Sequence, residues 1–322
     1  ETIVAMVLGA AVAAAGGGGA GAAVIAGGTL MAERGLLRYT REMETAADTA
    51  AIAVLERTGQ SARGLMEFLE VLADQELVAI GRQDPYLRTH PIGRDRVDFV
   101  RSHLETSRYA NAGPRPEFAQ MHRRMRAKLI GFLDASRALQ IYKESDTSLE
   151  ARYARAIAYS RRPDYPRALH LMDQLLAERP NDPYFAEAKG QFLFEAGRPV
   201  EALPLYERAN QLLPNDPLLM TGLGQVLVDS ALAQNNRRAI TVLEMARRAD
   251  PENTEPFRLL AIAYGRDGQI GMANLAQAEL AVMTHRQAQA RSFADRALRD
   301  LPSDSPAWLR AQDIRQAVER RP

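Results

Sequence analysis

The order of hydrophobic and polar positions divides the chain into an uncharged beginning and a long series of helical patterns. Residues 2–32 carry no charged side chain over 31 positions. Eight glycines interrupt this stretch, four of them consecutive at Gly16–Gly19, and the part before them, residues 2–15, has 14 residues. A helix that spans a membrane needs about 20 apolar residues. The pattern therefore predicts the end of a buried helix, a glycine loop and the approach to the next helix, with membrane-surface contact through residues 2–32 as the alternative.

Two helices are predicted after this stretch. The positions from about Met31 to Thr58 follow a helical period, and Gly59 is a typical end of such a segment. Ser61 precedes a second helical pattern that runs to about Ile80. A serine in this place can cap the first backbone N–H groups of a helix.

The next segment, residues 82–100 (RQDPYLRTHPIGRDRVDFV), contains two prolines. Residues before proline avoid the helical region, so an extended or turning segment is expected, with a helix resuming near Arg94. Residues 111–117 (NAGPRPE) are typical of a linker, and an amphipathic helix over residues 118–133 follows it.

The second half of the chain repeats itself. Pro180 and Pro214, in ERPNDPYF and LLPNDPLL, lie 34 residues apart, which is the period of tetratricopeptide repeats. Small residues let two helices approach, an aromatic ring fills the groove between repeats, and each helix pair needs its neighbours to bury its apolar face. A tetratricopeptide solenoid is therefore expected, with a further helix over residues 288–301 and a cap around Trp308. The recurring positions, unit by unit, are Tyr159, Ala168 and Pro180; Gly190, Ala202, Tyr206, Ala209 and Pro214; Gly224, Ala239, Leu243, Ala246 and Pro251, after three extra residues near Asn235; and Tyr264, Gly268 and Ala273.

Composition and charge exclude several classes of function. Hydrophobic residues make up 46% of the chain and charged residues 25%, as in folded proteins. The net charge is +1 and arginines alternate with acids, so no nucleic-acid partner is indicated. The chain has no cysteine, which excludes disulfides, cysteine-type zinc sites and cysteine nucleophiles. This composition is compatible with the bacterial periplasm but leaves the compartment open.

One alanine-rich helical segment carries two acids that raise a chemical question. Glu44 and Asp48 are four residues apart and share a helix face, where like charges repel. Either they are scattered solvent-exposed acids, or one is a metal ligand and the other its helper. Five histidines could complete a zinc site, but no two are spaced as His-x-x-x-His; they are His90, His103, His122, His170 and His285.

Three motifs and their order connect the chain to a known family. REMETAAD (41–48), LERTGQSARGLMEFLEVL (55–72) and PYLRTHPIGRDRV (85–97), followed by the repeats, resemble the BepA-type periplasmic zinc metalloproteases, relatives of the HtpX-type membrane peptidases. The resemblance covers nearly the whole chain. It implies an all-α fold in which the C-terminal part of a zinc metalloprotease domain precedes a tetratricopeptide solenoid. The expected parts are a hydrophobic Gly/Ala-rich segment (1–31), the ExxAD helix and THP segment (32–110), a linker with a connecting helix (111–148) and the repeats with their cap (149–322).

The resemblance also implies roles for four residues. Glu44 would be the third zinc ligand, and Asp48 the carboxylate that orients a ligating histidine. His90 would lie near enough to the metal to cap it, and Arg96 would be the arginine that usually follows. From the residues alone, an arginine ion pair for Asp48, a turn position for His90 and a helix-start position for Arg96 stay open. The other four histidines are expected at the surface or in packing.

The chain departs from the family at one point, because the motif His-Glu-x-x-His is absent. In the family this motif supplies two zinc ligands and the general base. We therefore expect a fragment that is inactive and does not bind Zn²⁺ tightly by itself. Its parent would be a zinc metalloendopeptidase of the bacterial periplasm, acting in outer-membrane protein quality control, with repeats that bind misassembled envelope proteins or the outer-membrane assembly machinery. The alternative is a non-catalytic repeat adaptor with a vestigial half site.

Overall fold

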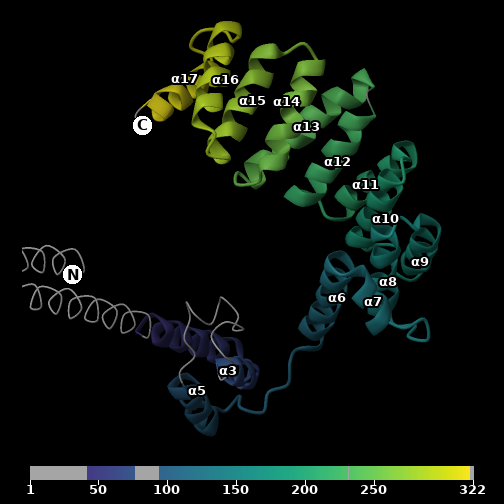
Figure 1. Ribbon diagram of the computed structural model, residues 1–322, viewed down its shortest axis with the longest axis vertical. Helices are drawn as coiled ribbons and strands as arrows, with labels where there is room; N and C mark the ends of the chain where they lie inside the picture. Colours follow the sequence, from purple (N-terminus) through teal and green to yellow (C-terminus); the bar gives the residue numbers. More distant parts are fainter. Residues whose placement is uncertain (1–41, 77–93, 231, 320–322) are drawn as a thin grey trace, which may run out of the picture. The chain divides into compact units, whose positions relative to one another are not determined.

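The described part of the chain is built from α-helices. The computed structural model describes residues 42–76, 94–230 and 232–319, and every regular element within those ranges is an α-helix (Figure 1). This confirms the predicted all-α class. The chain divides into two compact units, Glu1–Ala119 and Gln120–Pro322, while the domain boundaries drawn from the sequence stay a prediction. No helix in the described ranges is both long and apolar enough to cross a membrane, and residues 2–32 lie outside those ranges.

Three helices make up most of the described part of the first unit. They are a helix over 42–58, α3 (Arg63–Glu76) and α5 (Arg94–Thr106). One apolar face of each contributes to a shared core, because burial of these faces is the main favourable term in folding. The buried side chains of this core are Ile52, Ala62, Leu69, Val97 and Val100.

The turn between the first two of these helices follows the sequence prediction. Gly59 has a φ of +69°, a left-handed conformation that glycine adopts without a steric penalty, and the helix ends there. The Ser61 hydroxyl accepts the backbone N–H of Arg63 at 3.1 Å and donates to the carbonyl of Ala110 at 2.7 Å. Ser61 therefore caps α3, as predicted, and ties the start of α3 to the segment after α5.

Polar contacts also join α5 to its neighbours. His103 lies 3.1 Å from a carboxylate oxygen of Glu56, and the Ser107 hydroxyl donates to the same oxygen. Arg101 forms an ion pair with Glu70 on α3 at 3.0 Å. The C-terminal half of α5 is thus held to both other helices of the unit.

Two helices precede the repeats. They are α6 (Pro116–Leu133) and α7 (Ala135–Ile141), which is capped by Asp134. A Cβ atom added at Gly131 of α6 would lie 3.0 Å from Ile157, so a larger residue there would prevent this approach to the first repeat. These helices therefore pack against the solenoid at its N-terminal end.

The repeats form an α-solenoid of stacked helix pairs (Figure 1). Asp182 and Asp216 cap the helices that follow them by accepting two backbone N–H groups each, and a proline occupies the first helical position in both cases. The pairs are α8 (Leu149–Arg161) with α9 (Tyr165–Glu178), α10 (Pro183–Glu195) with α11 (Pro199–Leu212), α12 (Pro217–Asp229) with α13 (Ala233–Ala249), α14 (Thr254–Arg266) with α15 (Ile270–Met283), and α16 (Gln287–Asp300) with α17 (Pro306–Glu319).

Close helix crossings occur at the small residues that the repeat pattern singled out. The Tyr206 ring would lie 3.0 Å from a Cβ atom added at Gly190. The three extra residues of the third unit lengthen α13 to 17 residues, against 14 in α11. Asn236 in this longer helix is buried and donates to the carbonyl of Ala263 at 2.8 Å, which fixes α13 against the next repeat.

Gly224 marks the tightest of these crossings and gives a first prediction. A Cβ atom at this position would lie 2.4 Å from Cδ2 of Leu243, whereas nothing lies within 4 Å of one added at Gly265. We expect Gly224→Ala to lower the free energy of unfolding by about 1–3 kcal/mol through overpacking. Gly265→Ala, also within a helix, should raise it by about 0.5–1 kcal/mol through helix propensity. Urea denaturation followed by circular dichroism measures both, and equal effects would contradict the close packing.

The last described helix, α17, packs on the helices before it, and its role as a cap stays a prediction. The Trp308 indole N–H donates to the carbonyl of Leu298 at 3.1 Å, and α17 packs against α15 as well as α16. Ala311 and Ile314 of α17 are buried against the last repeat.

Candidate functional site

The two acids of the alanine-rich helix lie on one face and meet an arginine from α5. Arg96 Nε and Nη2 donate to the two carboxylate oxygens of Asp48 at 2.7 and 2.9 Å, and Arg96 Nη1 lies 2.9 Å from Oε2 of Glu44. Asp48 is only 3% exposed. The structure thus brings three of the four predicted site residues into one cluster, from segments about 50 positions apart.

The charges of this Glu44–Asp48–Arg96 cluster explain why two acids can stand four residues apart among alanines. A guanidinium binds a carboxylate through two parallel hydrogen bonds, which fixes orientation as well as charge. One arginine here orients both carboxylates and offsets their repulsion. The arginine ion pair that the sequence left open for Asp48 is present in the structure.

The fourth predicted residue, His90, lies outside the described residues. Within the described ranges, no group of three or more histidine, cysteine, aspartate or glutamate side chains could hold a metal ion. The cluster offers carboxylate oxygens, which zinc accepts beside histidine nitrogens. The donor set therefore fits part of a zinc site, and histidines would have to complete it.

The remaining histidines have other surroundings. The His170 ring lies 3.0 Å from the amide nitrogen of Gln174, one turn further along α9. His285 stands at φ +57° in the turn between α15 and α16, and His122 is exposed on α6. His103, two turns after Arg96 on α5, is paired with Glu56, so each of these four histidines has surroundings of its own.

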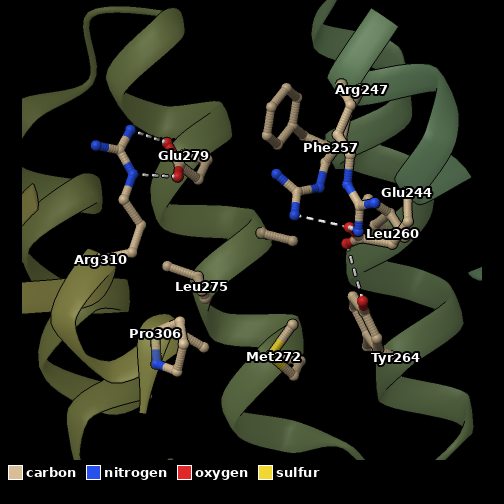
Figure 2. A pocket seen from close by; sticks show the side chains of 13 residues that line it. Glu244, Arg247, Phe257, Leu260, Tyr264, Met272, Leu275, Glu279, Pro306 and Arg310 are labelled. Atoms are coloured by element: carbon tan, nitrogen blue, oxygen red, sulfur yellow. Dashed lines mark hydrogen bonds and ion pairs between the residues drawn. The ribbon is translucent and has the colours of Figure 1, made fainter. Parts of the chain in front are cut away.

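A second candidate site lies in the repeats, and the sequence did not predict it. This repeat pocket has a volume of about 430 Å³ and is lined by residues of α13, α14, α15 and α17 (Figure 2). Figure 2 shows the ion pair of Arg310 with Glu279 on one side and that of Arg247 with Glu244 on the other. The apolar side chains between them include Phe257, Leu260, Met272 and Leu275.

Glu244 is the best-supported polar group of this pocket. It accepts the Tyr264 hydroxyl at 2.9 Å and the Arg247 guanidinium at 2.7 Å. Burial works to raise the pKa of Glu244, but the hydrogen bonds and charges of these partners and Arg248 outweigh it and leave the pKa below its usual value. Burial and the nearby Glu244 charge raise the pKa of Tyr264. Tyr264 was predicted as a packing residue, and its ring is indeed buried, but its hydroxyl also orients this carboxylate.

Known protein families match segments in both parts of the chain. Residues 1–104 match peptidase family M48, and this range contains Glu44, Asp48, His90 and Arg96. Residues 153–217 and 193–263 match tetratricopeptide repeats. The chain is therefore similar to M48 peptidases in its first part and to tetratricopeptide-repeat proteins in its second part, which confirms the resemblance drawn from its motifs.

Curated relatives match between 48% and 90% of this chain. A beta-barrel assembly-enhancing protease from Yersinia pestis is 24% identical over 300 residues, covering 90% of this chain and 58% of that protein. The protein of the same name from Escherichia coli K12 is 24% identical over 245 residues, or 73% of this chain and 48% of that protein. A Vibrio cholerae relative is 28% identical over 161 residues, or 48% of this chain and 33% of that protein. The chain thus spans between a third and three fifths of the length of these relatives.

The chain also has weak similarity to solved structures. A MamA structure from Desulfovibrio magneticus RS-1 is 19% identical and covers 54% of this chain and 95% of that chain, with a TM-score of 0.42. Yeast Tom70 is 14% identical and covers 85% of this chain and 58% of that chain, with a TM-score of 0.43.

Proposed function

We propose that this chain supplies part of a zinc metallopeptidase site, together with the solenoid that holds the protein partners of the enzyme. The observation that carries the proposal is the Glu44–Asp48–Arg96 cluster, held in a segment that matches peptidase family M48. Glu44 is assigned as an anionic zinc ligand and His90 as a capping ligand. Bound zinc would act as a Lewis acid and lower the pKa of a bound water.

The other two residues have positioning roles in this proposal. Arg96 fixes the carboxylates of Glu44 and Asp48 before metal binds. A carboxylate has about four acceptor positions, so Asp48 can accept a histidine N–H while it keeps both bonds to Arg96. Groups that hold ligating histidines in this way typically change metal affinity by about 10–100-fold when they are mutated.

The general base and the two histidine ligands are proposed to lie outside this sequence, because His-Glu-x-x-His is absent from its 322 residues. The chain by itself is therefore expected to be inactive. By analogy with relatives named for beta-barrel assembly, the parent enzyme would act in the bacterial periplasm on misassembled envelope proteins. The repeats would contact those substrates or the outer-membrane assembly machinery.

The zinc content of the protein encoded by the full reading frame tests this function. We expect about one zinc per chain and cleavage of casein. Glu44→Gln should remove the zinc and the cleavage, and Asp48→Asn should weaken zinc binding by about 10–100-fold. Glu67→Gln, an exposed acid of α3, is the matched control. Metal that binds the folded state must stabilise it, so the melting temperature reports zinc binding. The 322-residue chain alone is expected not to bind zinc tightly, and its melting temperature should therefore not rise with micromolar zinc.

The second candidate function, a non-catalytic repeat adaptor, is favoured by the missing motif and predicts a different result. The full reading frame would then hold no zinc and leave casein intact. Glu44→Gln would leave every measured property except local stability unchanged. This outcome would overturn the peptidase proposal and leave the solenoid as the functional part.

A further inference from the structure

The repeat pocket lies within the second unit, far along the chain from the metallopeptidase segment. It is open to solvent and its floor is mainly apolar, formed by side chains such as Phe257, Leu260 and Leu275. Its volume of about 430 Å³ leaves room for a large side chain and its neighbouring residues.

The acidic and basic side chains around this floor differ in how many of their hydrogen-bonding groups are already used. Three arginines and two glutamates line the pocket, which leaves one positive charge in excess. Both oxygens of Glu244 accept hydrogen bonds, one from Tyr264 and the other from Arg247 and Arg248. Both oxygens of Glu279 accept from Arg310, at 2.6 and 2.8 Å. The acids are therefore well supplied with donors.

The arginines of the pocket have N–H groups that make no hydrogen bond within the described residues. A guanidinium has five N–H groups, and Arg310 uses only Nε and Nη2 toward Glu279. Arg248 is 72% exposed and lies 3.4 Å from its carboxylate partner, at the edge of the interaction. Hydrogen bonds within the described residues leave Nη1 of Arg310, Arg247 and Arg248 for a ligand. An incoming carboxylate would complement these groups.

We infer that the repeat pocket binds an extended acidic segment of a partner protein, with one large apolar side chain on the floor and a neighbouring aspartate or glutamate at the arginines. Charge complementarity selects an acidic partner, and the apolar floor selects a peptide over a free anion. The inference deepens the proposed partner-binding role of the repeats and rests on that role, but it is independent of the metal site.

Fluorescence anisotropy of the 322-residue chain with labelled peptides tests the inference. The probes are fluorescein-Gly-Ser-Glu-Leu-Glu-Ser-Gly and the same peptide with Phe or Ile in place of Leu. We expect a Kd of about 0.1–1 mM for the best of these, as befits so small a contact. Replacing both glutamates of the peptide with glutamine, or its apolar residue with serine, should weaken binding at least about tenfold.

Two pairs of variants locate the binding on the protein. Arg248→Glu should weaken it about three- to tenfold, whereas Arg237→Glu, on the same helix and 77% exposed, should leave it unchanged. Ala307→Trp fills the pocket and should weaken binding at least about tenfold, with Ala317→Trp on an exposed face of α17 as its control. Circular dichroism confirms that each variant is folded.

Several results would overturn the inference. These are the failure of every probe to bind at about 1 mM, equal binding of the glutamine peptides, or equal effects of Arg248→Glu and Arg237→Glu. If the 322-residue chain binds the peptides but the protein from the full reading frame holds no zinc, this inference stands and the peptidase proposal fails. Zinc-dependent cleavage without peptide binding at this pocket would do the reverse.

Discussion

Arg96→Gln is expected to lower the free energy of opening of the described helices in the first unit by about 3–5 kcal/mol. Asp48 is 3% exposed and would lose two short hydrogen bonds and the positive charge that it faces. Removing one partner of a buried ion pair leaves a charge in a poorly solvated place, and this accounts for most of the effect. The repulsion between Asp48 and Glu44 would also be less well screened.

Native-state hydrogen exchange of the 322-residue chain, read in the helix over 42–58 and in α5, measures this effect directly. Arg101→Gln serves as the control, because Arg101 also lies on α5 and its pair with Glu70 of α3 joins two half-exposed side chains. An exposed pair contributes at most about 1 kcal/mol. Protection that falls equally in both variants would show that the cluster does not stabilise the unit.

The double variant Arg96→Gln with Asp48→Asn separates charge from shape. Replacing the carboxylate with an amide of the same size removes the buried charge, so much of the lost protection should return. A double variant that is less protected than Arg96→Gln alone would contradict the electrostatic explanation. The same series helps to interpret the zinc experiment, because it reports the loss of stability that follows when the ion pairs of the cluster are broken while the Glu44 carboxylate is kept.

The repeats could be predicted from the sequence because their information is local. Asp182-Pro183 and Asp216-Pro217 start their helices by capping and by a fixed φ, and both features are visible in neighbouring residues. Gly224 and its partner Leu243 occupy the repeat positions that Gly190 and Tyr206 occupy in the preceding unit. The local sequence preferences favour the same helices that the stacking of repeats requires. Such agreement allows the fold to be predicted from one sequence.

The candidate site was predicted by motif and not by contact. The residues around Glu44 do not predict its contact with Arg96, because the two lie on separate helices with α3 and a segment with two prolines between them in the chain. The repeat pocket was missed for a related reason. Glu244, Glu279 and Arg310 come from three helices, and only the packing of α17 against α15 brings Arg310 to Glu279. The spacing of Glu244 from Arg247 (i,i+3) and Arg248 (i,i+4) was a local signal, but such pairs are ordinary on helix surfaces.

Arg124→Lys is expected to lower the free energy of unfolding where α6 contacts α10 by about 2–4 kcal/mol, although it conserves charge. Both Nη atoms of Arg124 donate to Asp182, at 2.5 and 2.7 Å. Its guanidinium also lies 4.0 Å from the centre of the Phe185 ring. A lysine ammonium cannot reproduce the two parallel bonds and the planar stacking together. Arg123→Lys is the matched control, because Arg123 is 61% exposed and 3.4 Å from its partner Glu150; its effect should stay within about 0.5 kcal/mol.

Asp182 makes two sets of hydrogen bonds, and hydrogen exchange shows which of them accounts for the lost stability. It pairs with Arg124 on α6 and also accepts the N–H groups of Tyr184 and Phe185 as the cap of α10. If the carboxylate keeps its capping position beside lysine, exchange should rise along α6 and α8 while the first turn of α10 stays protected. If the arginine fork is what orients the cap, the amides of Tyr184 and Phe185 should exchange faster as well, and the loss should grow by about 1 kcal/mol, the usual contribution of a cap. Equal protection in Arg124→Lys and Arg123→Lys would contradict both mechanisms, since the bidentate geometry would then add nothing to the attachment of α6.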